Sequence, residues 1–76
     1  MIQELDDVIL NYDLPQYGLK EGDIGTAVLV HNDGEGYEVE FTSLDGETLA
    51  IVTLKASQAR SVHQHEIAHA RELVSA

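Results

Sequence analysis

Two Asp-Gly pairs restrict the topology of this chain more than any other feature. Asp33-Gly34 and Asp45-Gly46 each lie between two apolar runs. Asp-Gly in that setting is typical of tight β-hairpin turns, because the turn residues must adopt positive φ. Residues 37–41, which lie between the two turns, alternate apolar with acidic side chains, the period of a half-buried strand. The centre of the chain therefore predicts an antiparallel meander.

Shorter apolar segments extend this sheet in both directions. Residues 8–10, 27–31, 48–54 and 57–62 each predict a further strand. Pro15, Gly18 and the Gly22/Gly25 pair indicate a loop and a sharp corner before the second strand. About five short strands joined by tight turns favour a mainly β fold, a small SH3-like antiparallel barrel. We expect its core to contain Val28, Val30, Tyr37, Val39, Phe41, Leu49 and Ile51.

The period changes near residue 64. Ile67, Ala70, Leu73 and Val74 fall within about 120° on a helical wheel. Residues 63–76 therefore predict a short C-terminal α-helix, which at about ten residues is too short to be stable alone and must dock on something. We expect a single SH3-like domain over residues 1–76, with the barrel at 1–62 and the helix at 63–76.

Charge separates the possible classes of function. Fourteen Asp and Glu against four Lys and Arg give a formal net charge of −10. Because Lys and Arg supply most nucleic-acid affinity, we expect no binding to DNA or RNA. No apolar run approaches the ~20 residues of a membrane span, and no signal-peptide pattern is present, so we expect no membrane association. The absence of cysteine fits a cytoplasmic location.

The sequence from His65 to His69, His-Glu-Ile-Ala-His, matches the zinc-protease pattern in which two histidines bind the metal and the glutamate acts as base. A helix would bring His65, His69 and Glu72 within about 60° of one another. A zinc hydrolase also needs a cleft that holds its substrate and a preorganised water, which a 76-residue chain with a solvent-facing terminal helix does not offer. We therefore interpret these residues as a solvated surface with adventitious metal affinity at most, and expect no catalytic residue and no cofactor.

The order of motifs resembles one family. The pattern Gly-Leu-Lys-x-Gly-Asp-x-Gly-Thr-x-Val at residues 18–28, followed by Tyr-x-Val-Glu-Phe at residues 37–41, is similar to a family of small bacterial proteins classed as a domain of unknown function. The similarity continues through Leu-x-x-Ser-Gln-x-Arg-x-Val at residues 54–62 and ends on Glu-Ile-Ala-His-Ala-Arg. The resemblance implies an SH3-like barrel and a bacterial origin, and it implies no activity.

Three hypotheses for function follow. The first is a non-catalytic protein–protein interaction module, the acidic neutralising partner of a basic protein. The second is a zinc-dependent hydrolase centred on His65, Glu66 and His69, and the third is a purely structural homo-oligomer subunit. We also expect a homodimer, because a small chain has a thin hydrophobic core and an open barrel leaves strand edges unpaired.

Overall fold

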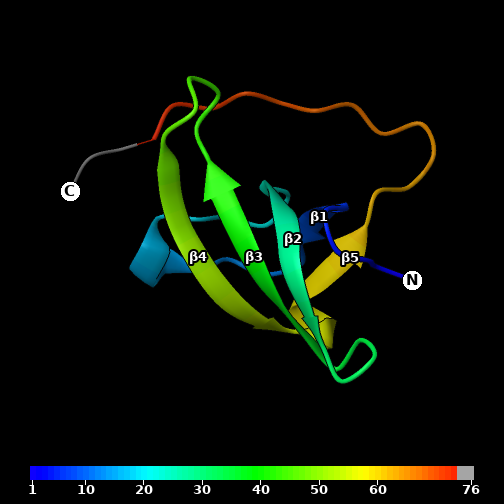
Figure 1. The fold of residues 1–76 in the computed structure, drawn as a ribbon. Helices are drawn as coiled ribbons and strands as arrows, with labels where there is room; N and C mark the ends of the chain where they lie inside the picture. Colours follow the sequence, from blue (N-terminus) through cyan, green and yellow to red (C-terminus); the bar gives the residue numbers. More distant parts are fainter. Residues whose placement is uncertain (74–76) are drawn as a thin grey trace.

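The structure is a computed structural model that describes residues 1–73, and its main feature is one five-stranded antiparallel sheet (Figure 1). The strands are β1 (Asp7–Leu10), β2 (Ile24–His31), β3 (Gly36–Thr42), β4 (Thr48–Lys55) and β5 (Ala59–Ser61). Two single 3₁₀ turns, η1 (Pro15–Tyr17) and η2 (Ala56–Gln58), are the helical segments of the described residues. None of these segments has the length and apolar character of a helix that crosses a membrane.

The strands lie in the order β4-β3-β2-β1-β5, and every neighbouring pair is antiparallel. The mainly β fold with five strands is therefore confirmed. β4 and β5 form the two edges and share no ladder within residues 1–73. Hydrogen bonding between strands thus gives a sheet with two open edges and not a closed ring.

Both predicted hairpin turns are confirmed. Asn32, Asp33 and Gly34 between β2 and β3 have φ values of 46°, 58° and 104°. Gly46 between β3 and β4 has a φ of 94°. Glycine and short polar residues adopt these left-handed conformations at low cost, so the two Asp-Gly pairs define where the chain reverses.

The inward face of β3 supplies the centre of the core. Tyr37, Val39 and Phe41 are 6%, 0% and 2% exposed, as their alternation predicts. They lie opposite Leu54, Val52 and Ala50 of β4, respectively. Directly opposed residues share one face of a sheet, so the β3 pattern determines which β4 residues are buried. Side chains from β1, the first loops, β2 and β5 complete the core: Ile2, Val8, Leu10, Leu14, Leu19, Ala27 and Ala59.

Three of the expected core positions are wrong. Ile51 is 60% exposed, and Leu49 and Val28 are exposed to a lesser degree. Ile51 pairs with the outward Glu40, which places it on the solvent face. Val28 lies in an irregularity of the β2–β3 ladder between Ala27 and Leu29, which breaks the alternation of β2. Val30 is partly buried and packs against the core.

The expected C-terminal helix is also wrong over its described part. Residues 66–73 have no helical hydrogen bonding and run as an irregular chain, and Ile67 is 93% exposed. This segment arches over the end of the sheet towards the β3–β4 hairpin (Figure 1). A helix of about ten residues needs an apolar surface to dock on, and the chain is held by polar contacts of its own instead. Val74 lies outside the described residues.

Candidate binding surfaces

The outer face of β3 presents two carboxylates in the middle of the β2–β3–β4 meander. Glu38 and Glu40 alternate with the buried Tyr37, Val39 and Phe41, so both point away from the core. Their cross-strand neighbours on β4 are Thr53 and Ile51. The alternation that builds the core on one face therefore places acidic groups on the other.

Glu38 is held in place from both neighbouring strands. His31 Nε2 on β2 lies 2.6 Å from its Oε2, and Thr53 Oγ1 on β4 lies 2.8 Å from its Oε1 and 2.9 Å from its Oε2. The hydrogen bonds from His31 and then from Thr53 lower the pKa of Glu38, because they favour its charged form. This carboxylate is thus favoured in its ionised form and held in one orientation.

Glu40 has one such contact, from the other end of β4. Thr48 Oγ1 donates a hydrogen bond of 2.9 Å to Glu40 Oε2. The hairpin turns at the two ends of the meander add four more acidic residues, Asp33, Glu35, Asp45 and Glu47. The meander therefore has acidic groups along its outer face and at both ends.

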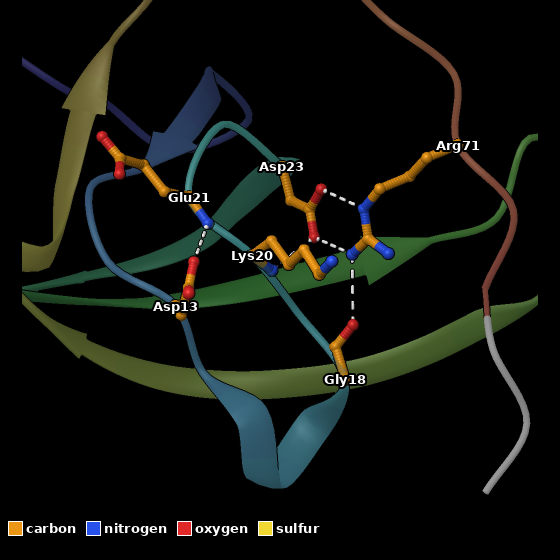
Figure 2. A network of polar contacts seen from close by, with 6 residues as sticks. All are labelled: Asp13, Gly18, Lys20, Glu21, Asp23 and Arg71. Carbon is orange, nitrogen blue, oxygen red and sulfur yellow. Dashed lines mark hydrogen bonds and ion pairs between the residues drawn. The ribbon is translucent and has the colours of Figure 1, made fainter.

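A second polar cluster joins the C-terminal segment to the loop before β2 (Figure 2). Arg71 Nε donates to Asp23 Oδ1 at 3.0 Å and Nη2 to Asp23 Oδ2 at 2.5 Å, so the pair is bidentate. Nη2 also donates to the carbonyl oxygen of Gly18 at 3.1 Å. Asp23 Oδ2 accepts the backbone N–H of Lys20 at 2.8 Å, and Asp13 Oδ1 accepts that of Glu21 at 2.9 Å.

The electrostatics of Asp23 follow from these contacts. Partial burial raises its pKa, but the hydrogen bonds from Arg71 and the Lys20 N–H, with the nearby positive charges, outweigh this effect. The pKa of Asp23 therefore lies below its ordinary value, and the same contact raises the pKa of Arg71. This pair anchors the C-terminal segment at Arg71 to the loop before β2.

A matching contact anchors the near end of that segment. Arg60 Nη1 and Nη2 on β5 donate to Glu66 Oε1 and Oε2 at 2.8 and 2.7 Å, and the His63 N–H donates to Oε1 at 2.6 Å. These hydrogen bonds lower the pKa of Glu66 to about 2. Two of the four Lys and Arg residues of the chain are thus engaged in ion pairs within it.

The predicted metal candidates do not share a helix face. His65 adopts a φ of 64° in a turn, and His69 and Glu72 follow in the irregular chain. Residues 1–73 bring no three His, Cys, Asp or Glu side chains into metal-binding geometry. Glu66, the base of the zinc-protease pattern, is bound to Arg60. The expectation that the chain binds no metal stays a prediction.

The C-terminal segment also encloses a groove of about 650 Å³ against the β3–β4 hairpin. Leu49, Phe41 and Leu73 contribute apolar walls, and the Asp23–Arg71 pair contributes a polar one. None of the three tyrosines, Tyr12, Tyr17 and Tyr37, lines this groove. Tyr37 is buried in the core, as core packing predicts.

Sequence reasoning missed the contacts that depend on distant segments. Asp23 and Arg71 are 48 positions apart, and no pattern in the sequence relates them. The contact of Thr53 with Glu38 could have been predicted from the sequence. Thr53 lies between the apolar Val52 and Leu54 on the strand that follows the second Asp-Gly turn. That alternation predicts an outward Thr53 beside an outward Glu38.

The sheet, its acidic outer face and its two hairpins define a small all-antiparallel β domain of acidic character. The chain belongs to the family described as a domain of unknown function, DUF4926, whose model matches residues 4–61. The match ends with β5, so the C-terminal segment after Ser61 lies outside it. No curated protein and no solved structure matches the chain significantly.

Proposed function

We propose that this chain is a non-catalytic interaction module that binds a basic protein on the acidic outer face of its β2–β3–β4 meander. One observation carries the proposal. Residues 24–54 contain no Lys or Arg, but they contain six carboxylates: Asp33, Glu35, Glu38, Glu40, Asp45 and Glu47. With Lys55 at the end of β4, the meander carries one Lys against six carboxylates, so its surface is predominantly acidic.

The ordering of the acidic side chains supports binding over mere solubility. His31 and Thr53 hold Glu38, and Thr48 holds Glu40. Binding to a preorganised side chain loses less conformational entropy than binding to a mobile one. Arg60 and Arg71 are engaged in ion pairs with Glu66 and Asp23, so neither cation is available to neutralise the meander.

The physical consequence is electrostatic steering. A surface of one sign raises the rate at which an oppositely charged protein associates, and the effect falls with added salt. Exposed Leu29 and Ile51 on the meander add apolar contact area. An acidic protein that covers the basic surface of an effector, as antitoxins and immunity proteins do, has these properties; this comparison rests on charge and fold only.

The strand order also supports a finer description of the fold. We propose that the sheet is an SH3-like barrel. Five short antiparallel strands, a 3₁₀ turn between β4 and β5, and the pairing of β5 with β1 support this description. A bacterial origin and a cytoplasmic location remain predictions of the sequence.

The test is capture of proteins from native cell lysate on the immobilised chain, with identification by mass spectrometry. The variant Glu38→Gln/Glu40→Gln removes the two central charges of the meander. Glu4→Gln/Glu72→Gln is the matched control, because it removes two exposed charges elsewhere. We expect a basic protein that the wild type and the control retain at 50 mM salt, that 500 mM salt elutes, and that the first variant loses. Equal retention by all three proteins would contradict the proposal.

A further inference from the structure

The outer edge of β4 has unpaired backbone groups. Ala56 N donates to Glu35 O at 3.1 Å, which marks residues 35 and 56 as a hydrogen-bonded pair in the β3–β4 ladder. Hydrogen-bonded pairs recur at every second position of an antiparallel ladder. Val52 and Leu54 therefore form backbone hydrogen bonds with their β3 partners, Val39 and Tyr37. The N–H and C=O groups of the intervening Ile51 and Thr53 therefore point away from β3, towards the open edge.

Within residues 1–73, no group hydrogen-bonds to these N–H and C=O groups. β4 forms a ladder with β3 alone, and no turn or loop backbone bonds to Ile51 or Thr53. At the end of the strand, the Lys55 N–H is bound by Gln58 Oε1 at 2.8 Å. Residues 48–54 contain no charge and no proline, the usual protections of an edge strand. A ladder irregularity near Leu49 interrupts only the beginning of the edge.

We propose that two copies of this chain associate through their β4 edges, antiparallel about a two-fold axis at Ile51. In this register Ile51 lies opposite Ile51 of the second copy, and the central pair exchanges two backbone hydrogen bonds. Thr53 of each copy then faces the part of the other strand that begins near Leu49, where the β3–β4 ladder is irregular. Beyond that part, the acidic Glu47 end of one copy meets the Lys55 end of the other, and Lys55 has no ion pair within the described residues.

The charge of the chain selects this edge over other surfaces. Two subunits of net charge −10 repel, but residues 48–54 bring no like charges together in the shared ladder. Glu38 and Glu40 lie on β3, so three strand spacings of about 4.8 Å separate them from the β3 of the second copy. That distance, about 14 Å, exceeds the Debye length of about 8 Å at physiological ionic strength. Association should therefore strengthen as salt is added.

This inference depends on the open edge and not on the proposed basic partner. An interface of one strand per subunit is small, so we expect dissociation in about the micromolar range. Sedimentation equilibrium of the wild type at 50 and 300 mM salt should show a dimer that tightens at the higher salt. Ile51→Lys should be folded by circular dichroism and monomeric, because Ile51 is 60% exposed. The control Leu44→Lys, at a 95% exposed turn leucine, should remain dimeric.

A cysteine variant tests the register directly. The chain has no cysteine, so Ile51→Cys introduces a single thiol at the two-fold axis. Hydrogen-bonded antiparallel pairs have Cα atoms about 5.5 Å apart, within the range of about 4.4–6.8 Å that disulfides need. Mild oxidation should cross-link Ile51→Cys at least ten-fold faster than Leu44→Cys. A wild type that stays monomeric at hundreds of micromolar in both salts would overturn the proposal. So would a dimer that Ile51→Lys leaves intact, or equal cross-linking of the two cysteine variants.

Discussion

Truncating Val52 to alanine should destabilise the sheet more than truncating Ile51, although isoleucine loses more atoms. The two residues are neighbours on β4 and point to opposite faces. Val52 is 5% exposed and lies opposite Val39, whereas Ile51 is 60% exposed and lies opposite Glu40. Which of the two alanine variants loses more free energy of unfolding therefore tests the register of β4 directly.

The magnitudes follow from the buried area. Val52→Ala removes two methyl groups, each worth about 0.8 kcal/mol when buried, and leaves a cavity, so we expect a loss of about 2 kcal/mol. Ile51→Ala removes two methyl groups and one methylene, worth about 2.4 kcal/mol at full burial. With 60% of the residue exposed, the expected loss is about 1 kcal/mol.

Urea unfolding followed by circular dichroism measures both values, at a protein concentration where the wild type is monomeric. The m-values should agree among the three proteins, because the surface exposed on unfolding hardly changes. A domain of this size has about 3–5 kcal/mol of stability, so both variants remain folded enough to fit. A larger loss for Ile51→Ala would mean that β4 is shifted by one residue, which moves every side chain of the strand to the other face.

Three other outcomes are expected. Gly25→Ala should lower the free energy of unfolding by about 1–3 kcal/mol in thermal or urea melts, because a Cβ there would lie 2.6 Å from Val39 Cγ1 and 2.9 Å from Glu40 O; an unchanged melt would contradict this packing. The Glu66 carboxyl should titrate by NMR with a pKa of about 2, against an ordinary 4.5. The Arg60 contact therefore stabilises the fold above about pH 4.5, and this stabilisation is lost as the pH falls towards 2. Arg60→Gln should return the pKa of Glu66 towards 4.5. Untagged protein should hold no stoichiometric zinc, and one tightly bound ion per chain that His69→Ala removes would restore the hydrolase hypothesis.

The sequence predicted the parts of this fold that depend on local signals. The two Asp-Gly turns and the alternation in β3 are read from a few consecutive residues, and both are present in the structure. The acidic outer face follows from the same alternation, because burial of Tyr37 and Val39 places Glu38 outside. Local order thus determined the meander and the sign of its surface.

The buried face of β4, the strand after the second turn, could not be predicted from local sequence patterns. Residues 49–52 are all apolar, so their period does not distinguish the buried face from the exposed one. The register with β3 determines which β4 side chains are buried. That register contains an irregularity near Leu49, which no sequence pattern predicts. The polar Thr53 and Lys55 are the better guide, because they place Val52 and Leu54 on the opposite, buried face.

The described part of the C-terminal segment is not the predicted helix, and the reason is energetic. An amphipathic pattern favours a helix only where an apolar surface receives it, and about ten residues cannot sustain a helix otherwise. In the extended form, Glu66 reaches Arg60 and Arg71 reaches Asp23, each through two charge-assisted hydrogen bonds. In a helix of 1.5 Å per residue, positions 66 and 71 would be only about 7.5 Å apart along the axis. The segment runs from β5 across the end of the sheet to the loop before β2 (Figure 1), so anchoring both ends requires an extended chain.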